Sequence, residues 1–321
     1  MSIVATEIVF HKAATSNDLA SNGGRIGTTI VTDGSLNNLF PNISSAERTA
    51  GKTRYRKMFL RNKNTGDLSI YSGEVWIGTR SLADDYYQLK AGNDSDVQSA
   101  AEAYTNWAGT GLLAGAAGSG ESSIEVDFDT TTGVWEDARV HITDGVNSLD
   151  TYVVGAPSWI GNAATFSISG ELGYNFSATT TIVSAIVYLG TVETSTSGWV
   201  DTSLSGTYDE ATYPVVTYNV GTVTDSWTLT FTDATNFAVV GTNTGSVGAG
   251  DINTDFSPSN GSSYYLKIDK DGWGGAWALG DVVTFNTVHA GKAIWVKEVA
   301  PAGVASYSNN DVELEWRGES A

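Results

Sequence analysis

Short runs in which apolar and polar residues alternate recur along the whole of this chain. In 124–128, Ile, Val and Phe alternate with acidic residues, and in 227–231, Trp, Leu and Phe alternate with Thr. The run 312–316 repeats the pattern near the C-terminus. A period of two places every second side chain on one face of a strand, so each run is typical of a half-buried strand in an antiparallel sheet.

Turn signals separate these runs. The chain has 36 Gly and only five Pro, which indicates many short strands joined by tight turns. The sequence therefore predicts an all-β protein made of several antiparallel, sandwich-like or barrel-like domains. The turn signals are Asp33-Gly34, Asn64-Thr65-Gly66, Asp144-Gly145, Asn260-Gly261 and Asp271-Gly272.

One segment has helical periodicity. In 95–107, Ser95 is placed to act as an N-cap with Gln98 at N3, and the apolar residues fall on one helical face. We predict one short helix there. The Gly/Ala-rich stretch 109–120 that follows is predicted to be a loop at a domain boundary.

Length and charge together suggest three domains. A chain of 321 residues exceeds the size at which single cores usually stop growing. Residues 1–90 carry 11 Lys/Arg against 8 Asp/Glu, whereas 91–199 carry one cation against 13 acids and 200–321 carry 5 against 15. We expect a basic-leaning β attachment domain at 1–92, a helix plus an acidic β domain at 93–195, and an acidic, Trp-rich β domain at 196–321. The strands at 294–296 and 312–316 are assigned to the last.

Charge and composition argue against several kinds of partner and compartment. The acidic residues 91–321 repel nucleic acid and anionic membranes, so neither is an expected partner. The chain has no Cys, which removes disulfide and thiol chemistry. The first ten residues lack a basic segment followed by an apolar run, and no stretch has the length and apolarity of a transmembrane helix, so neither a secretory signal nor a membrane span is predicted.

The residue types that carry metals do not cluster in the sequence. His11, His141 and His289 are far apart, with no zinc-binding spacing around them. A calcium-type loop could start at Asp269, but its fifth position is Trp and its twelfth is Gly, so we favour a turn. No metal and no cofactor are expected.

Catalytic motifs are also missing. The chain has no G-x-S-x-G elbow and no phosphate-binding loop. The acidic pairs in 125–129 and 313–315 have the residue types of a glycosidase, but alternating acids are more typical of solvated strand faces. We predict a protein that is not an enzyme.

Two aromatic residues lie in a Gly-rich turn. Trp273 and Trp277 fall within 272–277, outside any alternating strand. They either pack over a neighbouring hairpin, which we favour, or form an exposed contact patch of the kind found at interface hot spots. The second alternative would make them a platform for sugar rings.

A cluster of cations lies on one predicted strand. Arg54, Arg56, Lys57 and Arg61 surround the apolar residues 58–60. Such a strand can cover apolar surface with its long aliphatic stems. Alternatively, the four cations form an attachment face for an acidic protein surface.

Two stretches resemble virion structural proteins of tailed bacteriophages. The first is 21–62, with Asn38-Leu-Phe-Pro-Asn42, Ala46-Glu-Arg-Thr-Ala-Gly51 and Thr53-Arg-Tyr-Arg-Lys57. The second, looser one is 225–303, with Gly272-Trp-Gly-Gly-Ala-Trp277 and His289-Ala-Gly-Lys-Ala-Ile-Trp295. The match is one of strand-and-turn texture and covers somewhat over a third of the chain.

The resemblance implies a role and a location. It implies a non-enzymatic protein that needs no cofactor, is assembled in the host cytoplasm and resides in the virion. We expect a capsid-exterior decoration protein whose N-terminal domain binds the major capsid protein or another virion protein, with self-association, for example as a trimer. A tail, neck, baseplate or fibre component is the alternative within this class. A carbohydrate-binding host-adhesion protein is the alternative outside it.

Overall fold

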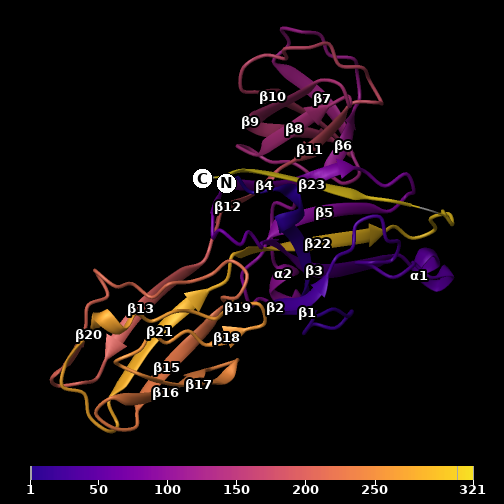
Figure 1. Cartoon of the computed structure of the whole chain (residues 1–321). Coiled ribbons are helices and arrows are strands. Elements are labelled where there is room, and N and C mark those ends of the chain that lie inside the picture. The colour runs from indigo at the N-terminus through magenta and orange to yellow at the C-terminus, as the bar shows by residue number, and fades with distance from the viewer. Residues whose placement is uncertain (1, 309, 321) are drawn as a thin grey trace.

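The computed structural model describes residues 2–308 and 310–320, and these form three β bodies. A barrel, a central sandwich and a third module follow one another through the molecule in Figure 1. All strand pairs are antiparallel, as the alternating runs predict, and the all-β class is confirmed. None of the helices in the described part of the chain is long and apolar enough to cross a membrane.

The central sandwich packs a five-stranded sheet against a three-stranded sheet. Its core takes residues from three separate stretches of the chain, including Leu60, Val187 and Ile294. The short helices η1 (Ala5–Glu7), α1 (Ser45–Ala50) and α2 (Gln98–Ala101) lie before or between its strands. The larger sheet has the order β2 (Gly23–Ile30), β1 (Ile8–Thr15), β3 (Lys52–Asn62), β22 (Gly291–Ala300) and β5 (Tyr86–Ala91), and the smaller has the order β12 (Val187–Val192), β4 (Ile70–Thr79) and β23 (Glu313–Ser320).

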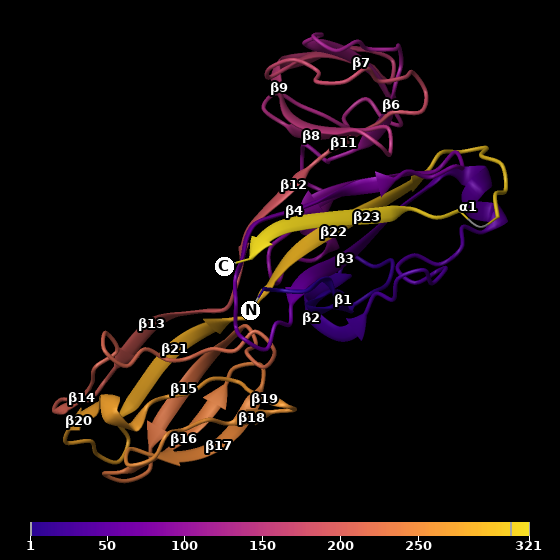
Figure 2. The ribbon, with the colours of Figure 1, turned by 45° about the horizontal axis from the view of Figure 1, so that its top comes forward.

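A closed six-stranded barrel is inserted between β5 and β12. Figure 2 shows it as a ring, and its interior is filled by apolar side chains such as Val126, Val140 and Phe166. In β7 the burial alternates strictly, as the sequence of 124–128 predicts. The barrel order is β10 (Ala163–Ile168), β7 (Ser123–Phe128), β6 (Thr110–Leu113), β11 (Ile182–Ala185), β8 (Arg139–Thr143) and β9 (Ser148–Ile160), which closes on β10.

The third module is inserted between β12 and β22. Its core is aromatic and includes Trp227, Phe231 and Phe237. Its main sheet has the order β13 (Ser195–Asp201), β21 (Val282–Val288), β15 (Asp225–Phe231), β16 (Asn236–Gly241) and β17 (Gly245–Asp251). Two small ribbons complete it, β14 (Gly206–Tyr208) with β20 (Trp273–Gly275) and β18 (Ser259–Asn260) with β19 (Ser263–Tyr264), and η2 (Lys270–Gly272) precedes β20.

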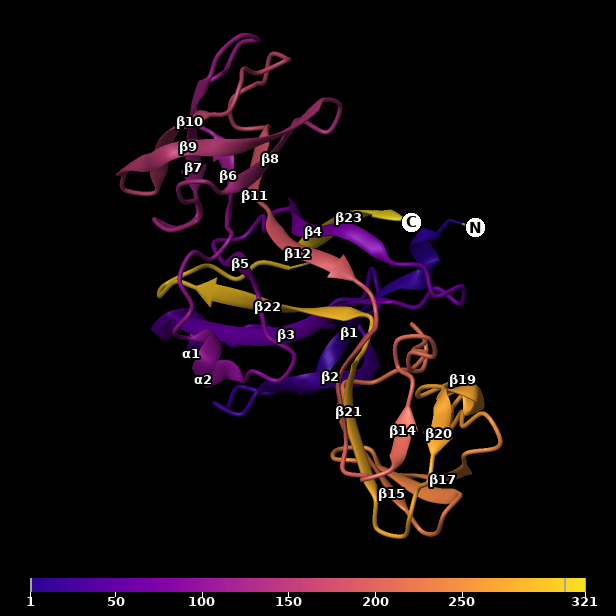
Figure 3. The ribbon, with the colours of Figure 1, turned by 90° about the vertical axis from the view of Figure 1, so that its left-hand side faces the viewer.

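Strand pairing departs from the three consecutive ranges that charge suggested. β22 pairs with β3 and β5, and β23 pairs with β4, so the strands assigned to a third domain at 294–296 and 312–316 belong to the central sandwich. The chain leaves the sandwich twice and returns each time, with β12 as the link between the two excursions (Figure 3). Antiparallel pairing over more than 200 residues of separation leaves no mark in local composition.

One local prediction is confirmed in place but not in extent, and another is wrong. The helix at 95–107 is reduced to the four residues of α2, its N-cap is Val97 without a side-chain cap, and Gln98 bonds to Asn22 instead. The Gly/Ala-rich stretch predicted to be a loop contains β6 of the barrel. Gly111 is needed there because a Cβ atom would lie 2.5 Å from the Asp127 carbonyl oxygen of the neighbouring strand.

Candidate functional site

The four cations proposed as an attachment face are buried. Their exposed fractions are 2% for Arg54, 4% for Arg56, 1% for Lys57 and 9% for Arg61. They therefore do not form an exposed face in this structure. The alternation of β3 fails here because both faces of the strand are covered, by the sandwich core on one side and by chain segments on the other.

Each of these cations has partners within the chain. Arg54 Nε lies 2.5 Å from Glu298 Oε2, Arg56 Nη1 lies 2.7 Å from Asp18 Oδ1, and Lys57 Nζ lies 2.5 Å from Asp96 Oδ1. Burial lowers the pKa of Lys57, while the hydrogen bond and charge of Asp96 oppose that shift. The cluster therefore holds the sandwich and the loops over it together.

Arg61, Arg25 and Asp67 fix the third module to the sandwich. Arg61 Nη2 donates to the Val220 carbonyl at 2.9 Å, and Arg25 Nη1 donates to the Thr224 carbonyl at 3.0 Å. The Asn219 backbone N–H donates to Asp67 Oδ1 at 2.7 Å. Charged hydrogen bonds to backbone groups give this junction a defined geometry.

The two tryptophans of the Gly-rich turn pack inward. Trp277 is 4% exposed and stacks on Phe231 at a centroid distance of 4.4 Å. Trp273 is half-buried and meets Trp277 edge to face at 5.3 Å. The structure thus matches the packing alternative, and these rings do not form an exposed platform for sugars.

The surface of the described chain is acidic. Among its Lys and Arg residues, Lys270 alone is exposed, and the others are buried or half-buried. More than half of the Asp and Glu side chains are exposed. Of the 11 Lys and Arg residues in 1–90, four are buried, seven are half-buried and none is fully exposed, so the basic balance of this segment does not give the sandwich an exposed basic face.

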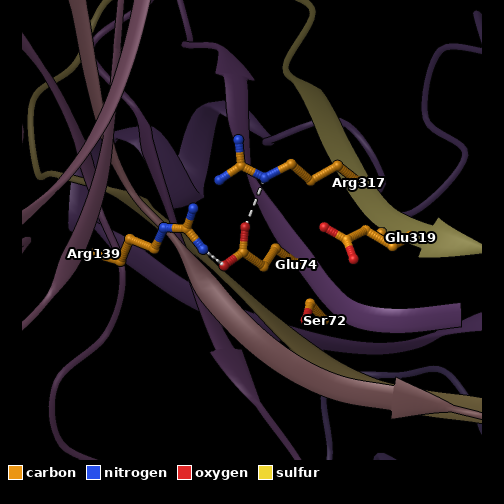
Figure 4. A pocket seen from close by; sticks show the side chains of 6 residues that line it. Ser72, Glu74, Arg139, Arg317 and Glu319 are labelled. Atoms are coloured by element: carbon orange, nitrogen blue, oxygen red, sulfur yellow. Dashed lines mark hydrogen bonds and ion pairs between the residues drawn. The ribbon is translucent and has the colours of Figure 1, made fainter.

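A polar site lies between the barrel and the sandwich. It is a hollow of about 140 Å³, here called the junction hollow, on the outer face of the small sheet beside the barrel. Figure 4 shows Arg139 and Arg317 reaching Glu74 from opposite sides, with Glu319 and Ser72 beside it. The hollow is lined by Ser72, Glu74, Arg139, Arg317, Gly318 and Glu319.

Glu74 is the centre of this arrangement. It is 1% exposed, accepts a hydrogen bond from Arg139 Nη1 through Oε1, and accepts one from Arg317 Nε through Oε2 at 2.7 Å. Arg139 comes from β8 of the barrel, whereas Arg317 comes from β23 of the sandwich. Hydrogen bonds from two guanidinium groups to the two oxygens of one buried carboxylate fix the position of that carboxylate.

A second carboxylate extends the network. Asp150 on β9 accepts from Arg317 Nη1 through Oδ2, and its Oδ1 lies 2.8 Å from His141 Nδ1. Burial raises the pKa of Asp150, but the hydrogen bonds from His141 and Arg317 outweigh burial and lower the pKa to about 2. The His141 ring lies 5.0 Å from that of Trp76, which continues the contact into β4.

Sequence reasoning did not find the junction hollow. One signal was available: Arg139 is the only cation among residues 91–199. A lone cation in an acidic segment indicates a specific carboxylate partner, but it does not reveal that the partner is Glu74 on a distant strand.

The calcium-type loop is the other charged site that the sequence suggested. Within residues 2–308 and 310–320, no three His, Cys, Asp or Glu side chains are grouped as metal ligands. The calcium-type loop begins with a 3-10 turn at Asp269, as favoured from the sequence. Lys267 Nζ lies 2.8 Å from Asp255 Oδ2 and 3.2 Å from Asp269 Oδ2, so an ammonium group already balances these carboxylates.

No family model, curated protein or solved structure matches this chain.

Proposed function

We propose that this protein is a non-enzymatic structural component of a tailed-bacteriophage virion, placed on the capsid exterior. The strand-and-turn resemblance in 21–62 and 225–303 supports the class of protein. The structural observation that carries a building-block role is the way both inserted modules are fixed to one sandwich. Arg139 and Arg317 join the barrel to it through Glu74, and Arg61 joins the third module.

This architecture suits a part that must keep its shape in an assembly. Buried ion pairs with several hydrogen bonds hold parts of a protein in one geometry more than they add net stability. The two inserted modules project from the sandwich in different directions (Figure 1). The sandwich, which carries both chain ends, is the proposed attachment module, through surfaces other than the buried cations of β3.

The charge distribution limits the partner surface. Since the exposed charges are almost all negative, an acidic patch on a capsid protein would be repelled by this protein. The proposed partner, the major capsid protein or another virion protein, therefore presents neutral or basic groups at the contact. This reverses the charge complementarity expected from the sequence of β3.

The test is immunogold electron microscopy of gradient-purified particles from the phage that encodes the chain, with antibody raised against the full chain. We expect label distributed over the head. Label confined to the tail or neck would move the protein to the alternative position within the virion. Particles that carry no label and no peptide of this chain by mass spectrometry would overturn the proposal.

A further inference from the structure

Three tyrosines are cross-strand partners of residues that line the junction hollow. Tyr71 is the cross-strand partner of Glu319, Tyr188 is that of Glu74, and Tyr152 is that of Arg139. Directly opposed residues of an antiparallel pair have side chains on the same face and Cβ atoms about 5 Å apart. Each of these tyrosines therefore stands beside a charged residue of the hollow, and the three are here called the tyrosine rim.

The rings of the tyrosine rim are available to a ligand. Tyr71 is 44% exposed, Tyr152 is 51% exposed and Tyr188 is 63% exposed. The guanidinium carbon of Arg139 lies 5.8 Å from the Tyr152 ring centroid, so that ring is held against the hollow. An exposed tyrosine presents an apolar face and a polar hydroxyl with few rotatable bonds, which suits contact with a partly apolar, partly polar ligand.

The hollow also offers both acceptors and donors. Among the described residues, Glu319 has no ion-pair partner, and its carboxylate points toward the centre of the site in Figure 4. Arg139 bonds to Glu74 through Nη1 only, and a third of its side chain is exposed. The exposed hydroxyl of Ser72 can donate or accept.

This mixture selects a class of ligand. A bound anion would face Glu319, and a bound cation would face Arg139 and Arg317. A hydroxyl group both donates and accepts, so adjacent hydroxyls can use the carboxylate and the guanidinium together. The C–H face of a sugar ring can pack on a tyrosine ring at the same time.

We propose that the junction hollow and the tyrosine rim bind a neutral saccharide at the barrel–sandwich interface. Binding sites often occur at such interfaces, where a few placed polar groups fix orientation. The small volume of the hollow limits it to one sugar ring or the end of a chain. The site is far from Trp273 and Trp277 in the sequence and in the fold, and it does not depend on the virion proposal.

The test is saturation-transfer NMR on the full chain with glucose, galactose, mannose, rhamnose and N-acetylglucosamine, each at millimolar concentration. We expect transfer to at least one of them. Tyr188→Ala and Tyr152→Ala should each weaken its binding by about three- to tenfold, the usual range for one aromatic contact. Glu319→Leu should abolish transfer, because it removes the two unpaired carboxylate oxygens of the site. Glu319 is exposed, so the substitution does not alter the core.

Tyr264→Ala is the matched control, since Tyr264 is 45% exposed and lies in the third module. Binding should be unchanged in that variant. Circular dichroism and the unfolding temperature show whether each variant keeps its fold. The proposal is overturned if none of the five sugars shows transfer, if both rim variants bind as the native chain does, or if Tyr264→Ala weakens binding as much as they do.

Discussion

At the scale of single residues, the four cations of β3 lie inside the protein and are paired there. Lys57 is the extreme case, with an ammonium group between the Asp96 carboxylate and the carbonyls of Gly24 and Asp96. The ring centroids of Phe59 and Trp295 lie 5.0 and 5.8 Å from the Nζ atom of Lys57. A charge so placed specifies which loop covers the sheet, because any other arrangement leaves it unpaired.

Lys57→Ala should destabilise the protein strongly. Removing one partner of a buried pair leaves the other charge uncompensated, which typically costs about 3–5 kcal/mol of unfolding free energy. Urea unfolding followed by fluorescence measures the change. Lys270→Ala, which removes an exposed partner of Asp271, is the control and should leave the midpoint unchanged. Equal midpoints for the two variants would contradict the structural role of Lys57.

Asp150 should make the barrel–sandwich junction sensitive to acid. Its pKa is lowered from 3.8 to about 2, so its contribution is complete above about pH 4 and is lost as the pH falls toward 2. Asp150→Asn should therefore cost about 2 kcal/mol at neutral pH and almost nothing at pH 2.

Urea unfolding of Asp150→Asn and the native chain at several pH values measures this difference. Glu125→Gln is a suitable control, since Glu125 lies on β7 of the same barrel with its side chain exposed to solvent. A difference between native and Asp150→Asn that stays constant down to pH 2 would contradict the assignment.

At the scale of elements, the ribbon of β14 and β20 closes the third module through its tryptophans. Trp277 lies over Phe231 of β15, and a Cβ atom on Gly206 of β14 would lie 2.4 Å from the Trp277 ring. Close approach of this kind requires glycine. The Gly-rich composition of 272–277 thus reflects dense aromatic packing rather than a flexible loop.

Trp277→Ala should destabilise the third module by about 3–5 kcal/mol, as large-to-small changes of buried aromatic residues do. Leu279→Ala, two residues along the same loop, removes a side chain that is 77% exposed and should have little effect. Thermal unfolding by calorimetry compares the two. If Trp277→Ala unfolds at the same temperature as Leu279→Ala, the ring is not part of the core.

Local patterns predicted the strands better than the joints between them. The runs at 124–128 and 227–231 are strands with alternating burial. Each pairs with a neighbouring strand along both edges and has one face on the core and one toward solvent. The alternating pattern fails for β3, because both of its faces are covered. It also fails for β6, where Gly111 allows the neighbouring strand to approach closely. Which Arg meets which Glu at the junction hollow depends on the register of distant strands, and no local signal contains it.

At the scale of the whole molecule, the last two strands of the chain complete the central sandwich. The strands β22 and β23 complete both sheets of a sandwich that β1 to β5 begin, after two complete modules have been inserted. The barrel is fixed to the sandwich by the ion pair of Arg139 with Glu74. The third module is fixed by hydrogen bonds, two of which run from Arg25 and Arg61 to backbone carbonyls. A sequence read from one end to the other suggests three consecutive domains, because charge varies along the chain while strand pairing does not follow it.

Hydrogen exchange of the native full chain, followed by mass spectrometry at increasing urea concentration, tests this scaffold most directly. Peptides from 291–300 and 313–320 should lose protection together with those from 52–62 and 70–79, as one cooperative unit. Peptides from 282–288, although adjacent in sequence to β22, should follow the third module. If 291–300 and 313–320 instead exchange with 225–231 and 282–288, the central sandwich is not built from both ends of the chain.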